Sequence, residues 1–262
     1  MMRYLRLLLV QLRMSAAAGM AYRADFLLEG LMSLASIGLT LLPLIVLYRG
    51  RDTVAGWDAP SALIVIAYFM AVKAVLEGVV SPSFVDLVER IRSGAFDYVL
   101  LKPVDAQAMV SASRFEPWQM FNFLGAVAIA VYAFYQRGSP PQLAHVAAGL
   151  VLFIAGVAAM YSLWILCAAA SFWVVRLDNL TYLLGSIFDT ARWPVQVFPH
   201  IWRFVFTFVI PVAVMTTYPA MALLGRLDAR TALATIGGAL ALLVISRLIW
   251  RAAIRSYTSA SS

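Results

Sequence analysis

The chain has 262 residues, of which 63% are hydrophobic and only 13% are charged. Soluble domains are roughly 45–50% apolar and about 25% charged, so this composition excludes an ordinary soluble domain and predicts an integral membrane protein. The formal net charge is +7, but the 20 basic residues are spread along the chain and form no dense basic block. This distribution argues against a nucleic-acid partner and favours bases that orient the chain in a membrane.

The first 24 residues have the pattern of an amphipathic helix. Arginines at positions 3, 6 and 13 fall on one helical face, and leucines at 5, 8, 9 and 12 fall on another. The apolar run from Leu7 to Val10 is shorter than the core of a signal peptide. We therefore expect residues 1–24 to form an interfacial helix that lies on anionic membrane lipid.

Apolar runs of roughly the 20 residues that a bilayer core requires predict six transmembrane helices. They fall at residues 26–48, 61–80, 118–135, 143–175, 180–193 and 232–250. Polar turns at 49–60 and 136–141 separate the first from the second span and the third from the fourth. We expect one all-α transmembrane domain over residues 1–262. Its parts are 26–80 (spans one and two), 82–117 (a cytoplasmic loop), 118–175 (spans three and four), 180–224 (span five and re-entrant helices) and 232–262 (span six and a polar tail).

The stretch 180–224 is irregular. It contains about 45 mostly apolar residues, more than one span needs. A charged residue at the centre of a lipid-facing helix costs roughly 2.5–3.5 kcal/mol, and this stretch holds Asp189, Arg192 and Arg203. We expect a short fifth span followed by re-entrant helices, whose backbone must be covered by protein or line a watery cavity. Four prolines break the stretch: Pro194, Pro199, Pro211 and Pro219.

Two pairs of opposite charges fall inside predicted spans. Lys73 and Glu77 are four residues apart, and Asp189 and Arg192 are three apart, so each pair can meet on one helix face. We interpret both as structural ion pairs, the second fixing the fifth span against the re-entrant segment. The alternatives are a proton relay through Lys73 and Glu77, and a place in a substrate path for Asp189 and Arg192.

The loop 82–117 is the longest run that could hold a soluble contact surface. Its first residues predict a short amphipathic helix that ends at Gly94. The helix could float on lipid, but we favour docking of a soluble partner, with apolar anchors in the partner's groove and charges at the rim. The anchors would be Phe84, Leu87, Val88 and Ile91, and the rim Glu89, Arg90 and Arg92.

The bases predict the orientation of the chain. With the N-terminus inside, twelve arginines and lysines face the cytoplasm and five face outward. The positive-inside rule favours this arrangement, which puts both termini and the loop 82–117 in the cytoplasm. The twelve are at positions 3, 6, 13, 23, 90, 92, 102, 114, 176, 247, 251 and 255, and the five are at 49, 51, 137, 226 and 230.

Catalytic and metal-binding motifs are absent from the sequence. There is no G-x-x-x-x-G-K-[ST], H-E-x-x-H, C-x-x-C or G-x-S-x-G. His145 and His200 are too far apart in sequence to predict a metal centre, and the single Cys167 has no partner for a disulfide. We expect no cofactor or metal on this chain and no nucleotide hydrolysis by it alone.

Three stretches resemble ABC-2-type transporter permeases of bacteria. Residues 91–104, with sequence IRSGAFDYVLLKPV, resemble the cytoplasmic loop of that family. Residues 191–199 and 209–220 are similar to the family's segment before its last span, and 255–262 resemble its tail. The resemblance runs in order over essentially the whole chain. It adds four loop residues to the predicted coupling site: Phe96, Asp97, Lys102 and Pro103.

The resemblance implies half of a type V ABC exporter in the bacterial cytoplasmic (inner) membrane. Its parts would be an N-terminal connecting helix, a coupling helix between spans two and three, and re-entrant helices before the last of six spans. Two separate ATPase subunits would carry ATP and Mg²⁺, and a second permease, either a paralogous chain or another copy of this one, would complete the complex.

The resemblance further implies efflux of a hydrophobic or amphipathic small molecule, such as a drug, antibiotic or natural product, as in multidrug resistance. Two other classes remain in view. An ion- or proton-coupled secondary transporter would use Lys73, Glu77 and Asp189 as its relay, but no internal repeat is evident. A membrane-embedded enzyme or scaffold is disfavoured by the lack of a catalytic constellation.

Overall fold

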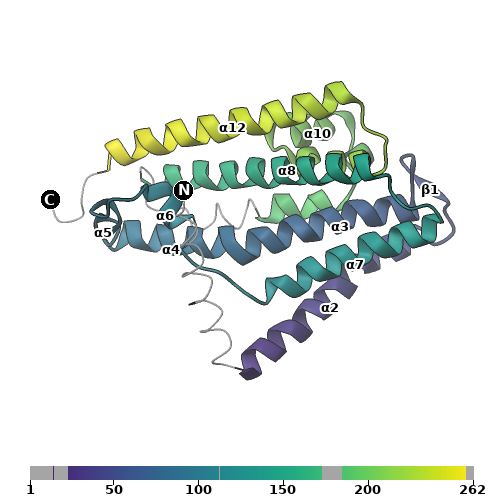
Figure 1. Ribbon diagram of the computed structural model, residues 1–262, viewed down its shortest axis with the longest axis horizontal. Coiled ribbons are helices and arrows are strands. Elements are labelled where there is room, and N and C mark those ends of the chain that lie inside the picture. The colour runs from purple at the N-terminus through teal and green to yellow at the C-terminus, as the bar shows by residue number, and fades with distance from the viewer. Residues whose placement is uncertain (1–13, 15–22, 112, 173–184, 258–262) are drawn as a thin grey trace.

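The computed structural model describes residues 14, 23–111, 113–172 and 185–257, and most of the expected connecting helix at 1–24 lies outside them. The described part is a bundle of helices with one small β-hairpin, which confirms an all-α architecture (Figure 1). Within it, four helical segments are long and apolar enough to cross a membrane: Leu28–Leu47, Ala59–Arg92, Leu143–Ala170 and Ala229–Arg255. The long helices are α2 (Arg23–Leu47), α3 (Ala59–Val75), α7 (Gln119–Arg137), α8 (Leu143–Ala170) and α12 (Ala229–Arg255).

The two ends of the bundle differ in structure. At the β-hairpin end, β1 (Thr53–Val54) pairs antiparallel with β2 (Trp57–Asp58). The turn between them has positive φ at Ala55 (52°) and Gly56 (83°), as tight hairpins require. The opposite end, called the loop end, carries α4 (Ser81–Arg92), α5 (Asp97–Leu100) and α6 (Ala106–Val110).

An ionic cluster closes the β-hairpin end. Asp58 accepts a hydrogen bond from the Ser61 hydroxyl at 2.7 Å and forms ion pairs with Arg137 at 3.8 Å and Arg226 at 3.5 Å. Burial raises the pKa of this carboxyl, but the Ser61 hydroxyl, backbone hydrogen bonding and the two arginines outweigh it, so the pKa lies below its ordinary value. The cluster joins the start of α3 to the end of α7 and to the chain before α12.

Helix α3 is the centre of the bundle. Its residues are apolar on all sides, and Ile64, Val65 and Phe69 are almost completely buried. A helix that is apolar all round is stable only when other elements surround it. Here α7, α8 and the segment that precedes α12 supply those surroundings, whereas α2 is the least buried of the four candidate spans.

The second span continues without a break into the predicted coupling helix. The π-helical turn η1 (Leu76–Val80) joins α3 to α4. Pro82 in the first turn of α4 cannot donate to the carbonyl four residues earlier, and that carbonyl, on Gly78, accepts from the backbone N–H of Glu116 at 2.8 Å. The second span and the predicted amphipathic helix therefore form one helical rod, which runs from Ala59 to Arg92.

Two other predicted boundaries concern the fourth and fifth spans. The end of the fourth differs from the structure, and the start of the fifth lies outside the described residues. Helix α8 ends at Ala170, earlier than the predicted 175, with Ser171 and Phe172 in a turn. The predicted fifth span began at 180, and residues 180–184 are outside the described part. Residues 185–188 are helical and lead into the 3₁₀ turn η2 (Asp189–Arg192), so the described portion of this span is short.

The segment between η2 and α12 is a series of short helices. A proline stands at each of three breaks, Pro194 before η3, Pro199 before α10 and Pro211 before η5, whereas Pro219 lies in the first turn of α11, which continues η5 without a break. Proline cannot donate the backbone hydrogen bond that would continue a helix, which explains these positions. The elements are η3 (Val195–Val197), α10 (His200–Phe204), η4 (Val205–Val209), η5 (Ala213–Thr217) and α11 (Tyr218–Leu223).

This broken segment enters and leaves at the β-hairpin end. Trp57 donates its indole N–H to Gln196 at 3.3 Å near the entry, and Arg226 meets Asp58 after the exit. Between these points the chain reaches Met215, which lies against Gly156, about 20 Å along α8 from its start. The broken segment therefore returns to the end of the bundle at which it entered.

Buried threonines satisfy the non-helical backbone of the segment. The Thr216 hydroxyl donates to the carbonyl of Ala191 at 2.8 Å, and the Thr217 hydroxyl accepts from the N–H of Val195 at 3.1 Å. Both threonines are fully buried. Irregular backbone is tolerated at membrane depth only with such partners inside the protein.

Gly156 allows the broken segment to approach α8 closely. A Cβ at this position would lie 2.9 Å from the Cα of Met215 and 3.0 Å from the carbonyl oxygen of Val214. Because backbone atoms cannot move aside cheaply, we expect Gly156→Ala to lower the free energy of unfolding by about 1–3 kcal/mol. Thermal unfolding in detergent measures the loss. In the control Gly238→Ala, no atom lies within 4 Å of the added Cβ, and an equal loss in both variants would contradict the close packing.

Candidate functional site

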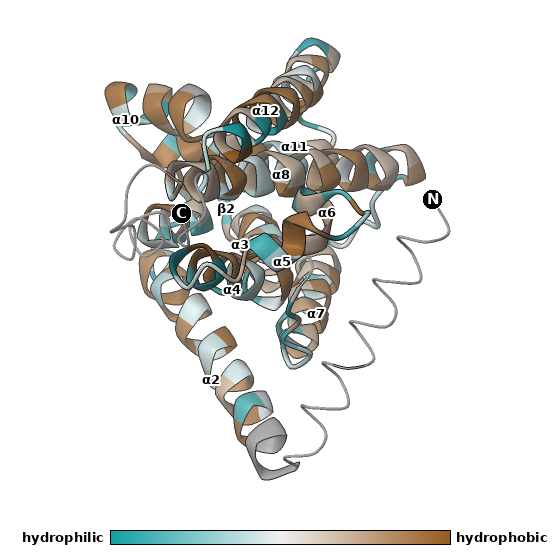
Figure 2. Cartoon of the chain, turned by 90° about the vertical axis from the view of Figure 1, so that its left-hand side faces the viewer, coloured by the Kyte–Doolittle hydropathy of each residue, from teal (hydrophilic) through white to brown (hydrophobic). Residues whose placement is uncertain are grey.

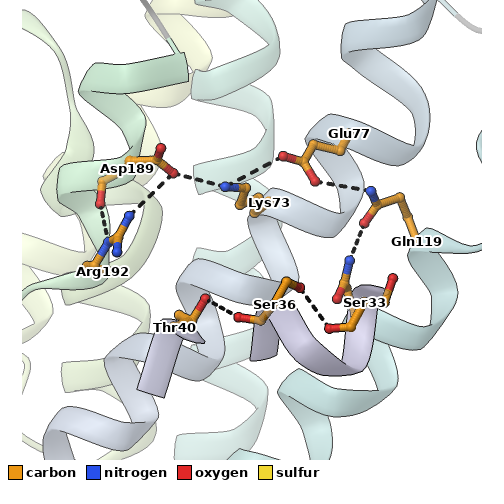
Figure 3. A network of polar contacts seen from close by, with 9 residues as sticks. Ser33, Ser36, Thr40, Lys73, Glu77, Gln119, Asp189 and Arg192 are labelled. Carbon is orange, nitrogen blue, oxygen red and sulfur yellow. Dashed lines mark hydrogen bonds and ion pairs between the residues drawn. The ribbon is translucent and has the colours of Figure 1, made fainter. Parts of the chain in front are cut away.

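The two predicted ion pairs form one network within the bundle (Figure 3). The Lys73 Nζ lies 3.0 Å from the Asp189 carboxylate and 3.6 Å from that of Glu77. Arg192 approaches the same Asp189 carboxylate at 3.8 Å and donates to its backbone carbonyl at 2.8 Å. Lys73 is therefore shared between two carboxylates. The closer one belongs to Asp189 in η2, and the farther one to Glu77, which is four residues along the same helical rod.

An aromatic ring completes the network. Both Lys73 and Arg192 lie with their cationic groups 5.7 Å from the centre of the Phe69 ring, a distance at which a cation is attracted to a ring face. Phe69 in turn stacks on Phe188, with ring centres 5.3 Å apart. The start of η2 is thus held to α3 by charge and by ring packing together.

The network extends to α7 through Gln119. Its amide donates to the second carboxylate oxygen of Glu77 at 3.1 Å and accepts from Asn122 at 2.6 Å. Neither Gln119 nor the contact between Lys73 and Asp189 was expected, since these residues are far apart in sequence and no local spacing indicates them. The side chains of Lys73, Glu77 and Asp189 are 35–41% exposed and line a cleft of about 560 Å³.

The apolar face of α4 points into the chain itself. Phe84 and Leu87 are buried at 6% and 2% exposure, and Val88 and Ile91 are half-buried against the same core. The expectation that Phe84 and Leu87 enter a partner's groove is therefore wrong. The periodicity identified an apolar face correctly, but this chain covers most of it.

The charged face of α4 remains accessible. Glu89 and Arg92 are exposed, and Arg90 forms an ion pair with Asp86 at 2.8 Å. The helix ends where predicted, because Gly94 has a φ of 74°, a left-handed conformation that favours glycine. The chain then turns toward α5.

Phe96 anchors the loop to the ends of α8 and α12. It is fully buried, and its ring lies 5.4 Å from that of Phe172 after α8, 6.3 Å from Trp250 on α12 and 5.5 Å from Tyr257. Such edge-to-face pairs are each worth about 0.5–1.5 kcal/mol beyond the area they bury. The resemblance marked Phe96 as a coupling residue, and the structure shows it holding the loop to two long helices.

A small tip projects beyond this anchor. Tyr98 is 71% exposed and Leu101 is 80% exposed, and Lys102 and Pro103 beside them are exposed too. Asp97, at the start of α5, is half-buried. Figure 2 views the molecule from this end, with α4, α5 and α6 facing the viewer and carrying both hydrophilic and hydrophobic residues. We call Tyr98, Leu101, Lys102 and Pro103 the loop tip.

A polar network fixes the chain after the tip. Arg247 on α12 pairs with the Asp105 carboxylate and donates to Gln107 at 2.7 Å. Gln107 donates to the Tyr161 hydroxyl of α8 at 3.0 Å, and the Ser111 hydroxyl lies 2.6 Å from the same oxygen. The Arg247 hydrogen bond lowers the pKa of Asp105 despite its partial burial. Sequence reasoning did not find this network.

Among the described residues, no three metal-ligating side chains gather to form a cation site. The structure presents two separate candidate functional features. One is the charge network between α3 and η2, and the other is the loop tip with its anchor.

We expect Lys73 and Asp189 to be energetically coupled. Lys73→Met and Asp189→Asn should each destabilise the protein in detergent, because each leaves a charge without its nearest partner. The double variant should cost about 0.5–1 kcal/mol less than the sum, a low coupling because both side chains are partly exposed. The control cycle pairs Lys73→Met with Asp86→Asn, roughly 20 Å away along the same rod, and should be additive. If the stability losses of Lys73→Met and Asp189→Asn were also additive, a stabilising salt bridge between Lys73 and Asp189 would be ruled out.

Comparison with known families agrees with this arrangement. Residues 34–261 match the family described as ABC-2 family transporter protein. The matched range includes the charge network, the loop tip and the broken segment. No curated protein and no solved structure gives a significant match. The chain therefore belongs to the ABC-2 family of transporter proteins, as a membrane-embedded permease.

Proposed function

We propose that this permease is half of an exporter and that a separate ATPase drives it by docking on the loop tip. The observation that carries the proposal is the position of the tip. Tyr98 and Leu101 are highly exposed, and they follow directly on Phe96, which is fully buried between α8 and α12. Exposed aromatic and aliphatic residues next to a rigid anchor are typical of interface centres.

The surroundings of the tip suit a partner contact. Glu89, Arg90 and Arg92 at the end of α4 would form a charged rim, as polar residues do at the margins of interfaces. Phe84 and Leu87 would act indirectly, by holding α4 against the bundle. ATP and Mg²⁺ would be bound by the partner, since this sequence contains no phosphate-binding loop.

The distribution of basic residues supports a cytoplasmic loop end. Helix α2 starts on the side of the bundle away from the β-hairpin, and helix α12 ends near α4–α6 (Figure 1). The positive-inside rule then places the loop end in the cytoplasm and the β-hairpin end outside. The described bases at the loop end are Arg90, Arg92, Lys102, Arg114, Arg251 and Arg255, together with Arg247 in the last turns of α12.

The path of the long helices is compatible with six spans. Helices α2, α3, α7 and α8 alternate in direction, whereas α12 runs in the same direction as α8. A fifth span between α8 and α12, followed by re-entrant helices, would account for this and is part of the proposal. We place this multi-pass chain in the bacterial inner membrane with both termini in the cytoplasm.

The complex would contain two ATPase subunits and a second permease, either a paralogue or a second copy. Poor burial of α2 supports a second permease, because this span has few neighbours within its own chain. Figure 2 shows α2 extending away from the other helices. A partner span packed there would bury apolar side chains such as Leu31, Leu34 and Leu39, which are exposed in the single chain.

The cleft beside the charge network is the proposed route of the substrate. It lies between the α3–α4 rod and residues 185–189. Its lining combines apolar side chains such as Phe84 and Val88 with the charged groups of Lys73, Glu77 and Asp189. A hydrophobic or amphipathic small molecule would match this mixture.

An ion- or proton-coupled transporter is the second candidate. The position of Lys73, within 3.6 Å of the carboxylates of both Glu77 and Asp189, favours it, because titratable side chains inside membranes commonly form proton relays. Proteoliposomes separate the two mechanisms. Export that needs both the ATPase and ATP supports the exporter, whereas transport by the chain alone under a proton gradient supports the relay.

The loop tip should be required for ATPase binding. We expect Leu101→Asp to reduce co-purification of the ATPase at least tenfold, because a charge at the centre of an apolar contact must be desolvated, and tenfold corresponds to about 1.4 kcal/mol. The amount of ATPase retained on the tagged permease measures the effect.

The matched control is Leu143→Asp at the β-hairpin end, where the leucine is equally exposed, 84% against 80% for Leu101. This variant should keep the ATPase. Normal ATPase retention by a well-folded Leu101→Asp variant would exclude the tip as the docking surface.

A further inference from the structure

An apolar groove of about 800 Å³ runs along α3 between α7 and α8. Four alanines make it hollow, Ala67 and Ala71 on α3 and Ala126 and Ala130 on α7, because their short side chains leave the space between the three helices unfilled. Among the described residues that line it, none carries a charge. The groove is separate from the charged cleft of the proposed transport route, which lies on the other side of α3 and α4.

The length of the groove matches one leaflet of a bilayer. The turn 138–141 closes it at the β-hairpin end, and aromatic side chains narrow it at the other, where Phe123 and Phe153 meet with ring centres 6.4 Å apart. From Tyr135 to Phe123, α7 rises about 18 Å. Half of a hydrocarbon core roughly 30 Å thick is about 15 Å.

We propose that this groove binds one acyl chain of a bilayer phospholipid from the leaflet on the β-hairpin side. The groove lies on helices that cross the membrane, so the surrounding solvent is itself made of acyl chains. A small-molecule site needs convergent polar groups to orient its ligand, and the polar side chains of the lining are only the hydroxyls of Tyr68, Tyr135 and Ser139.

The bound chain would also complete the packing of α7. This helix packs mainly on α3 and α2, and the groove separates it from α8. An unfilled apolar groove forfeits the dispersion contacts of its lining atoms. An acyl chain restores those contacts, and the headgroup stays at the water edge near the exposed Tyr135 and Ser139.

Two tryptophan substitutions on α7 test the proposal. Ala130→Trp places an indole in the groove, whereas Ala128→Trp places it on an exposed part of the same helix that does not line the groove. Palmitoyl-oleoyl phosphatidylglycerol is titrated into the delipidated full chain, and native mass spectrometry counts the bound lipid. We expect one tightly held lipid in the wild type and in Ala128→Trp, and at least tenfold weaker binding in Ala130→Trp.

A second pair on α8 serves if Ala130→Trp does not fold. Leu150 lines the groove and Val151 does not, although both are about half exposed. Leu150→Trp should weaken lipid binding and Val151→Trp should not. Equal lipid binding by groove and control variants overturns the proposal. So does unchanged lipid binding in an Ala130→Trp complex that has lost export, which would assign the groove to the transported molecule. The lipid titration needs no ATPase, so its result is independent of the proposed function.

Discussion

Polar groups inside a bilayer need partners from the protein, and this requirement determines how the chain is built. The broken segment before α12 can exist only because Thr216 and Thr217 bond its non-helical backbone and because Lys73 neutralises Asp189 at 3.0 Å. These contacts hold the segment against α3 and α8, and Gly156 leaves room for it. The charged cleft lies where this attachment brings residues 185–189 beside the rod of α3 and α4.

The sequence predicted the elements well and their partners poorly. Apolar length found the four candidate spans of the described residues, Pro194, Pro199 and Pro211 marked real breaks, and Gly94 ended α4 as expected. The bridge from Lys73 to Asp189 was missed because 116 residues separate the two and nothing local indicates their contact. The same holds for Arg247 and Asp105, which meet only after α12 has packed beside the loop.

The error at α4 has a specific physical cause. A helical period shows that one face of residues 84–91 is apolar, but it does not show what covers that face. The π-turn at 76–80 keeps α4 in line with α3, so the apolar face stays against the bundle. The apolar side chains left exposed at this end are those of the loop tip beyond the Phe96 anchor, and the charged face of α4 is exposed beside them. Because Phe96 contacts both Phe172 and Trp250, a displacement of the loop tip would be transmitted to the ends of α8 and α12.

A photo-crosslinking amino acid placed at Tyr98 distinguishes docking on the loop tip from docking elsewhere. If the ATPase docks on the tip, inside-out vesicles that contain the assembled complex should show a crosslink from position 98 to the ATPase. No crosslink is expected from position 84, where Phe84 is buried in this chain, or from position 143 at the opposite end. Crosslinks from position 84 but not from position 98, in a complex that still exports, would contradict docking on the loop tip.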